Sequence, residues 1–474
     1  MKENMRIVLA DSHGTIMGKD QSSANLSLLY LASYIREKAD FPIEFKYLPQ
    51  SKTEKDHFET LEKFKPHVYA VSFTSYAAVV TYYLINKIKE LYPEILIVCG
   101  GPHATPSYED IFKNSQADIC VIGEGEQTFY EIVANFDSLD TYKQNIDGIA
   151  YMENGKCFKT SGRDVIDEVD SIPFPARDLI VNDEFVGLVY SKGKPNTEMV
   201  VTRGCPFRCV FCANPVFRLK KGPLFRSRSP QNIAAEAEEL YQLGYREIFI
   251  HSDELNLSLD WSIELCKALY ELGHEDLYFQ THLRVQPMSE EFAYWLKKAN
   301  FWMVKIGIES TSDRVLAGIK KKMSHDKTIR ACKMLSDQGI KVFGFLMLFN
   351  YWEEDGELQH DTIAETKATI KEMYKLWRKG YLHYISWEIS RPVQGSEFYD
   401  IALKHGMIDE NYYPNDHFQT FDFIKGITKR EFNRIFRESR IQQAILILTS
   451  GNIEWRNYRA IYRKGVTIIN GIKS

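Results

Sequence analysis

The chain has 474 residues, of which 44% are hydrophobic and 26% are charged, so it has room for two or three globular domains. The formal net charge of −5 provides no general attraction to nucleic acid or to an anionic membrane, and neither is expected as a partner. The N-terminal residues lack the apolar stretch of a signal peptide, and the uncharged run 68–86 contains too many Ser and Thr residues for a membrane span. We therefore predict a cytoplasmic protein.

Residues 1–140 alternate short apolar runs with helical patterns, which is typical of a doubly wound, Rossmann-like parallel sheet. In such sheets, ligands bind where the loops leave the carboxyl ends of the strands. The strands are predicted at residues 6–10, 43–48, 68–73, 95–99 and 118–122, with helices at 26–38 and 77–91.

Four loops follow these predicted strands, at 11–18, 72–76, 100–105 and 123–128, and each is rich in Gly, Ser, Thr or His. A single loop of this kind indicates little, because glycines also close ordinary strand-to-helix turns. Four together favour a domain that binds a large polar ligand. The candidate binding residues are His13, Ser72, Ser75, Gly100, Gly101, His103, Gly123, Glu124, Gly125 and Glu126.

The pattern breaks from 141 to 196, where Gly, Pro and charged residues predict a short hairpin and then a linker between domains. From 197 to 408 strands and helices alternate again, as in a partial (β/α)6 barrel, whose chemistry belongs at the carboxyl ends of its strands. The remaining residues, 409–474, are predicted to form a helical domain. The barrel strands are predicted at 199–202, 247–251, 277–281, 304–308, 342–348 and 384–389.

Three of the eight cysteines, Cys205, Cys209 and Cys212, follow a predicted strand in the spacing C-x3-C-x2-C. Three thiolates on one tight loop can bind three irons of a [4Fe–4S] cubane and leave the fourth iron without a protein ligand. Zinc is the alternative, but it would require a fourth ligand from a second Cys or His pair, and none follows at a plausible spacing. The five isolated cysteines are interpreted as buried, inert thiols.

This cysteine segment resembles the cluster motif of the radical S-adenosylmethionine (SAM) superfamily. The resemblance implies that the open iron binds SAM and that SAM is cleaved reductively to give a carbon radical. Segment 392–408 is similar to the end of the family's barrel. For Asp253, Glu254 and Arg284 an ordinary polar role at a strand end is the alternative. The cofactor contacts implied by the resemblance are Phe211, Asp253, Glu254, Arg284, Gly307 and Glu309.

Segments 98–106, 117–129 and 169–179 resemble the subgroup that has a cobalamin-binding domain before the barrel. The resemblance implies a cobalamin between the two domains and methylation of an unactivated carbon in a small-molecule biosynthetic intermediate. It also implies an electron donor such as flavodoxin or ferredoxin. His13 is a candidate cobalt ligand, although Ile16 occupies the glycine position of the motif D-x-H-x-x-G.

Two other functions stay open at this point. One is a radical dehydratase, cyclase or rearrangement enzyme that has the same architecture and uses no cobalamin. The other is a non-catalytic sensor built on the same fold.

Two segments depart from the family's pattern or add to it. Asn350, Tyr351 and Trp352 replace the usual Gly-x-Pro turn, and we expect them to shape the substrate pocket. The segment from Lys425 onward is basic and aromatic, which is compatible with binding of RNA or a phosphorylated substrate but favours a helical cap with a solvated basic face.

Overall fold

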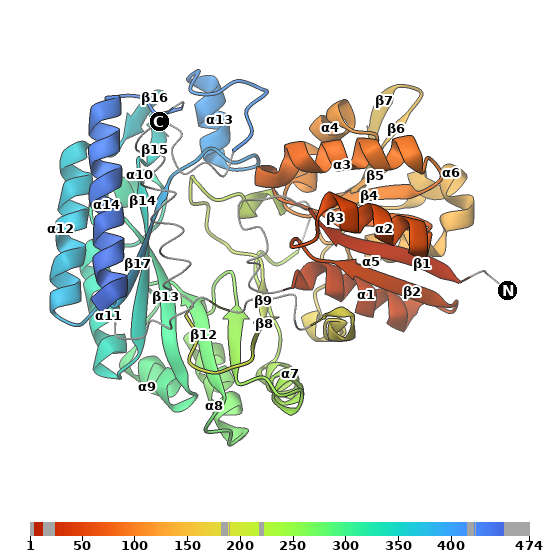
Figure 1. The fold of residues 1–474 in the computed structure, drawn as a ribbon. Coiled ribbons are helices and arrows are strands. Elements are labelled where there is room, and N and C mark those ends of the chain that lie inside the picture. Colours follow the sequence, from red (N-terminus) through yellow and green to blue (C-terminus); the bar gives the residue numbers. More distant parts are fainter. Residues whose placement is uncertain are drawn as a thin grey trace.

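The structure is a computed structural model, and it describes residues 4–12, 24–181, 188, 190–217, 222–414, 421 and 423–449. Two mainly parallel sheets lie side by side, with the N-terminal sheet on the right of Figure 1 and the larger barrel on the left. The candidate cobalt ligand His13 lies outside the described residues.

Within the described residues, the N-terminal sheet has seven strands in the order β2-β1-β3-β4-β5-β6-β7, and pairing is parallel from β2 to β5. This arrangement confirms the predicted doubly wound fold. Its elements are β1 (Met5–Asp11), α1 (Leu26–Lys38), β2 (Ile43–Leu48), α2 (Glu54–Phe64), β3 (Val68–Ser72), α3 (Ala78–Leu91), β4 (Leu96–Gly100), α4 (Ala104–Asn114), β5 (Ile119–Val121), α5 (Glu126–Ala134), β6 (Ile149–Glu153) and β7 (Lys156–Lys159).

The predicted hairpin forms, but it belongs to the first sheet and not to the linker. Strand β6 pairs antiparallel with β5, so the sheet runs past the predicted boundary at residue 140 and ends at Lys159. The pairing covers the edge of β5, which would otherwise expose unpaired backbone groups. The following connector lies along α1, where the backbone N–H of Ala176 donates to the carbonyl of Leu29 over 3.2 Å.

The second sheet is a partial barrel of six parallel strands among the described residues, in the order β17-β14-β13-β12-β11-β8. It confirms the predicted (β/α)6 architecture. Its elements are β8 (Asn196–Val200), α7 (Pro230–Gln242), β11 (Glu247–His251), α8 (Leu259–Glu271), β12 (Tyr278–Leu283), α9 (Glu290–Lys298), β13 (Phe301–Glu309), α10 (Asp313–Gly318), α11 (His325–Asp337), β14 (Lys341–Leu348), α12 (Ile363–Arg378), β17 (Tyr384–Ile389), α13 (Glu397–Lys404) and α14 (Lys429–Thr449).

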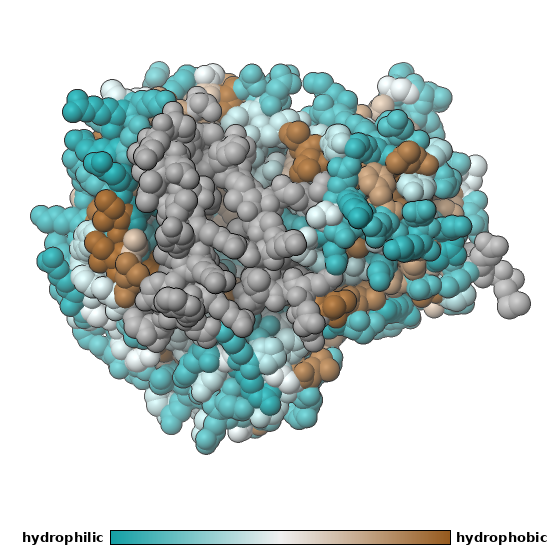
Figure 2. All heavy atoms as spheres, in the orientation of Figure 1, coloured by the Kyte–Doolittle hydropathy of each residue, from teal (hydrophilic) through white to brown (hydrophobic). Residues whose placement is uncertain are grey.

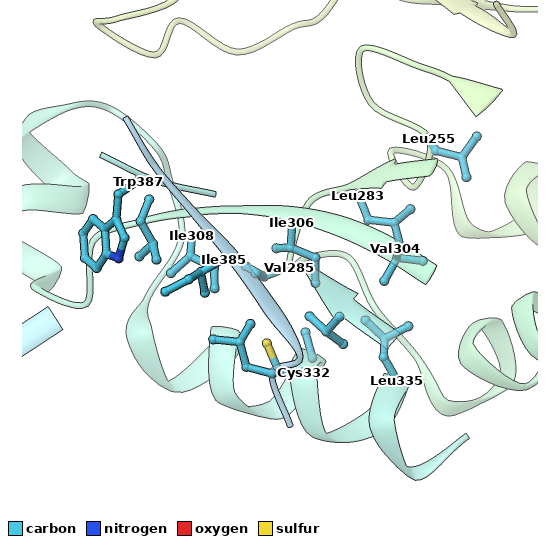
Figure 3. Packing of buried hydrophobic residues seen from close by; sticks show 14 of the residues in the cluster. Leu255, Leu283, Val285, Val304, Ile306, Ile308, Cys332, Leu335, Ile385 and Trp387 are labelled. Atoms are coloured by element: carbon cyan, nitrogen blue, oxygen red, sulfur yellow. The ribbon is translucent and has the colours of Figure 1, made fainter. Parts of the chain in front are cut away.

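The two faces of the barrel sheet differ in chemistry because side chains alternate along each strand. The outer face is apolar and packs on the helices, as Figure 3 shows for Val304, Ile306 and Ile308, which lie on the side of the sheet toward Cys332 and Leu335 of α11. The inner face, called the barrel lumen below, carries polar and aromatic side chains in register. Pairs of register partners on this face are Phe249 with Glu198, His282 with Lys305, Lys305 with Phe343, and Phe345 with Ser386.

Helix α14 packs on the open edge of the barrel beside β17 and α12 (Figure 1). The indole N–H of Trp387 donates to the Gln442 side chain over 3.1 Å, and the Gln442 amide donates to the carbonyl of Ile370 over 2.6 Å. Phe432 and Phe436 are buried against the barrel, so this part of the basic segment is a helical cap. Trp455, Tyr458 and Tyr462 lie outside the described residues.

The surface is mostly hydrophilic on the face drawn in Figure 2, where hydrophobic residues form small separate groups. None of the helices in the described part of the chain combines the length and the apolar character needed to cross a bilayer.

The segment Asn350–Trp352 belongs to the core, contrary to its predicted place at the substrate pocket. Tyr351 and Trp352 begin the hairpin β15 (Tyr351–Glu354) and β16 (Glu357–His360), and both side chains are buried. The Trp352 indole fills the space over Gly318, where a Cβ would lie 2.2 Å from the ring. The segment lines no part of the large cavity described below.

Candidate active site

The three clustered cysteines lie on a loop that leaves the short strand β9 (Thr202–Arg203) at the carboxyl end of β8. Gly204 opens this loop with a φ of +81°, and a Cβ there would lie 2.5 Å from the carbonyl oxygen of Leu224, so only glycine fits. Its N–H donates to the Asp253 carboxylate over 2.7 Å. Further along, the N–H of Val210 donates to the carbonyl of Ile319 over 3.1 Å. The loop is therefore anchored to the ends of two barrel strands and to the turn after α10.

The chemistry of this loop fits a [4Fe–4S] cluster. Burial raises the pKa of Cys205 to about 12 and raises that of Cys212 above its ordinary value, so both are neutral thiols until a metal displaces the proton. No three Cys, His, Asp or Glu side chains of the described residues converge as they would around a single ion. A cubane needs a wider arrangement, because each of its three thiolates binds a different iron.

Glu254 and Arg284, two predicted cofactor contacts, form a buried pair beside Cys205. The Arg284 guanidinium lies 3.3 Å from Oε1 of Glu254 and stacks 3.7 Å from the centre of the Phe207 ring. The thiol of Cys205 lies 3.5 Å from the same carboxylate oxygen. The other oxygen, Oε2 of Glu254, is buried and has no hydrogen-bond partner among the described residues. A buried acceptor without a donor beside the cluster loop is suited to an ammonium group of a ligand.

A second buried pair lies at the end of β13. The Lys321 ammonium lies 2.8 Å from the carboxylate of Glu309, and both side chains are about 10% exposed. A Cβ on Gly307 would lie 2.5 Å from Glu309 and 2.8 Å from Lys321, so the pair occupies the space that the glycine leaves open. The Lys321 ammonium also lies 5.7 Å from the centre of the Phe211 ring. The predicted contacts Gly307, Glu309 and Phe211 thus lie together behind the cluster loop.

A cavity of about 610 Å³ lies where the carboxyl ends of the two sheets face each other. The barrel contributes the ends of β8, β11 and β12, including Asp253, His251 and His282. A Cβ on Gly100 would meet no atom within 4 Å, so this glycine leaves the backbone open to a ligand. The predicted ligand-domain residues that line the cavity are Ser72, Gly100, Gly101, Gly123, Glu124, Gly125 and Glu126.

Comparison with known families agrees with this geometry. The family model of the radical SAM superfamily matches residues 199–390, and the model of the B12-binding domain matches residues 20–133. The chain therefore contains a domain of the radical SAM superfamily, preceded by a B12-binding domain. Members of this superfamily use a [4Fe–4S] cluster and SAM, and the chain adds a B12-binding domain before the barrel.

Relatives cover most of the chain. An uncharacterized methyltransferase from Pyrococcus horikoshii is 28% identical over 88% of this chain and 86% of its own length. The anaerobic magnesium-protoporphyrin IX monomethyl ester cyclase of Rubrivivax gelatinosus is 24% identical over 84% of this chain and 69% of the cyclase. The structure of the radical SAM methyltransferase TsrM from Kitasatospora setae, with cobalamin and a [4Fe–4S] cluster bound, shares the fold with a TM-score of 0.65 at 15% identity, covering 83% of this chain and 77% of TsrM.

In this radical SAM enzyme, two predicted ligand residues of the B12-binding domain, Glu124 and Glu126, make ion pairs with the barrel. Arg203, two residues before Cys205, lies 2.6 Å from Glu126 and 3.7 Å from Glu124. Arg226 donates to both carboxylate oxygens of Glu124. The arginines hold the pKa of Glu126 below its usual value despite burial. We call these four residues the interdomain latch.

Ser75 and His103 do not line the cavity, although both were candidate binding residues. Nδ1 of His103 lies 2.9 Å from the Ser75 hydroxyl, and Nε2 lies 2.6 Å from the Tyr82 hydroxyl. The ring is fully buried, and burial lowers its pKa to about 4, so it is a neutral core histidine. Tyr82 continues the network to Asp110, 2.8 Å away.

Sequence reasoning missed several residues of the site. Phe207 stacks on Arg284, and Lys321 pairs with Glu309, but neither position carries a distinctive motif. The one signal was their place in the sequence. Phe207 lies inside the cysteine segment, and Lys321 lies inside a run of three lysines. Arg203 and Arg226 were also missed, because their partners are about 77 and 102 residues away along the chain.

Proposed function

We propose that this chain is a cobalamin-dependent radical SAM methyltransferase, which methylates an unactivated carbon of a small-molecule biosynthetic intermediate. The cavity carries the proposal, because the glycine-rich loops of the B12-binding domain and the strand ends beside the cluster loop line the same space. A reaction that combines a group from each domain needs such a shared space. The P. horikoshii relative and TsrM, both named methyltransferases, support the proposed reaction.

In this proposal Cys205, Cys209 and Cys212 are the three ligands of the cluster. When bound, the cluster supplies the electron that cleaves SAM, and cobalamin supplies the methyl group. Asp253 holds the N–H of Gly204 and so fixes the start of the cysteine loop. Glu254, oriented by Arg284, presents its unpaired oxygen beside that loop as an acceptor for the amino group of SAM.

The B12-binding domain contributes an open backbone surface to the cavity. Ser72, Gly100, Gly101 and Gly123 stand at the carboxyl ends of β3, β4 and β5, where a large planar ligand can approach the main chain closely. The interdomain latch holds this surface against the barrel and helps to exclude water. An electron donor such as flavodoxin or ferredoxin, and a cytoplasmic location, are further parts of the proposal.

A radical cyclase, or a dehydratase or rearrangement enzyme, is the second candidate. One observation favours the cyclase, namely the likeness to the R. gelatinosus cyclase over 84% of this chain. The two candidates differ in their products, because methyl transfer adds one CH₂ to the substrate formula and cyclisation or dehydration does not.

The first test is anaerobic purification with hydroxocobalamin, followed by measurement of cobalt and iron and of 5′-deoxyadenosine formed from SAM. We expect about one cobalt for about four irons, and loss of SAM cleavage in Cys209→Ala because the cubane loses one of its three protein ligands. Iron without cobalt would favour the second candidate. Unchanged SAM cleavage in a reconstituted Cys209→Ala protein would contradict the assignment of the cluster ligands.

A further inference from the structure

Two nitrogen-bearing side chains lie next to each other in the barrel lumen below the cluster loop. His282 of β12 and Lys305 of β13 are register partners, so their side chains leave the sheet on the same face. His282 lines the large cavity, and its ring centre lies 5.0 Å from that of Phe249. The Lys305 ammonium lies over the same ring, 4.1 Å from its centre. Phe249 thus holds Lys305 beside His282, which is the member of the pair that lines the cavity.

Among the described residues, neither side chain has a hydrogen bond or an ion pair, and both make contacts with aromatic rings. Burial lowers the pKa of His282 to about 3 and that of Lys305 to about 8. At neutral pH the imidazole is therefore neutral with one N–H donor, whereas the lysine is mostly an ammonium with three. Both side chains are partly buried, and their donors have no acceptor among the described residues, so they are available to a ligand that supplies one.

The carboxylates of the lumen are already engaged elsewhere. Glu198 lies 2.8 Å from Nε2 of His251. Glu247, at the inner end of the lumen, accepts hydrogen bonds from the Gln280 amide, the Trp302 indole and the chain segment 191–193. Both carboxylates favour the charged form of Lys305 at longer range, but neither lies within ion-pair distance of its ammonium among the contacts of the described residues.

Aromatic rings surround the two donors. The Phe345 ring centre lies 5.7 Å from that of His282 and 5.0 Å from that of Phe343. Phe343 in turn stacks on Tyr384, with a 22° angle between the ring planes. This wall is apolar and is suited to a flat carbon frame, whereas the donors are suited to oxygen.

We propose that Lys305 and His282 bind an anionic oxygen group of the substrate, a carboxylate or a phosphoryl group, whose carbon frame lies against Phe249 and Phe345. This inference rests on the proposed function, because it names the substrate class of the same cavity. An ammonium and a neutral imidazole together offer charge-assisted hydrogen bonds to such a group. The anchored end would hold the rest of the substrate toward the cavity and the cluster loop.

The test uses the cobalamin- and cluster-loaded enzyme and three probes with one carbon frame: 2-naphthoate, 2-naphthyl phosphate and the neutral 2-naphthamide. Binding is measured by anaerobic equilibrium dialysis for wild type, Lys305→Met, Lys305→Arg and His282→Phe. Lys113→Met, which removes an exposed lysine of α4, is the matched control. Iron content and thermal melting of each variant show whether the fold is kept.

We expect wild type to bind one of the two anionic probes at least about tenfold more tightly than the amide. Lys305→Met should abolish this preference while binding the amide within about twofold of wild type; Lys305→Arg and Lys113→Met should keep it. Preference for naphthoate indicates a carboxylate substrate, and preference for naphthyl phosphate indicates a phosphorylated one. If neither anion is preferred, or if Lys305→Met keeps the preference, the inference is wrong.

SAM cleavage and cobalt content are measured on the same wild-type sample. An enzyme that holds cobalt and cleaves SAM but shows no anion preference contradicts the substrate class alone. An enzyme that holds no cobalt contradicts the proposed function, whatever the probes do.

Discussion

At the residue scale, the site depends on buried charges whose partners come from different elements. Glu309 at the end of β13 and Lys321 after α10 are each about 10% exposed, so each would be costly to bury alone. The neighbouring Lys320 also has a carboxylate partner, Glu397, but there both side chains are more than 40% exposed. These two lysines are adjacent in the chain and differ mainly in burial, which makes them a matched pair.

We predict that Lys321→Met lowers the free energy of unfolding by about 3–5 kcal/mol, because it leaves the Glu309 carboxylate buried without its partner. Lys320→Met should cost less than about 1 kcal/mol, since water screens that pair. Urea unfolding of both variants measures the difference. Equal effects of the two substitutions would show that burial does not separate the two ion pairs.

Asp361 should make stability depend on pH. Burial raises the pKa of this carboxyl from 3.8 to about 7, although Asn350 and Thr366 donate to it over 3.4 and 3.3 Å. Between these values the folded protein keeps a proton that the unfolded chain has released. The free energy of unfolding should therefore fall by about 2 kcal/mol from pH 5 to pH 7 through this group. Asp361→Asn should remove that part of the slope, as measured by urea unfolding at several pH values; an unchanged slope would refute the assignment.

At the element scale, helix α14 completes the barrel instead of forming a separate domain. Its apolar residues pack against β17 and α12, and Gln442 links the two by accepting from Trp387 and donating to Ile370. Gln442 is buried, whereas the next residue, Gln443, is half-buried and accepts one hydrogen bond from Arg440.

We predict that Gln442→Leu lowers the free energy of unfolding by about 1–3 kcal/mol, because the Trp387 indole N–H remains buried without a partner. Gln443→Leu should change it by less than about 1 kcal/mol, since water can replace its single hydrogen bond. Thermal melting of the two variants tests this. A larger loss in Gln443→Leu would contradict the role of Gln442 as the link between α14 and the barrel.

At the scale of the whole molecule, the interdomain latch couples the B12-binding domain to the cysteine loop. Arg203 stands two residues before Cys205 and pairs with Glu126 across the cavity, and Arg226 pairs with Glu124 beside it. The position of one domain is thus transmitted to the loop of the other through mostly buried ion pairs.

We predict that Glu126→Arg and Arg203→Glu each separate the domains, because each places like charges in contact. Limited proteolysis should then cut the connector 160–181 at least about tenfold faster than in wild type, since fewer contacts would hold it against the first domain. The double exchange Glu126→Arg with Arg203→Glu should restore most of the protection, which mass spectrometry of the fragments would show. Equal cleavage of the single variants and wild type would argue against the latch.

The sequence by itself determined the class of fold and the cluster motif. Strand β2 at 43–48, helix α1 at 26–38 and strand β11 at 247–251 are predicted to the residue, because periodic apolar patterns and caps are local features. The spacing of Cys205, Cys209 and Cys212 is local as well, and so is its resemblance to the radical SAM superfamily. His103 shows where local reasoning fails, because a loop histidine and a core histidine look alike until the packing around Tyr82 is known.

Only the tertiary structure decided which residues meet across the chain. The hairpin at 149–159 joined the first sheet because β5 needed a partner at its edge, and Trp352 became core because Gly318 left room for its ring. Glu126 and Arg203, or His282 and Lys305, are brought together by domain packing and strand register, which no short stretch of sequence encodes. Motifs depend on local spacing, whereas ion pairs and ligand pockets depend on contacts between distant segments, and those form only when the whole chain has folded.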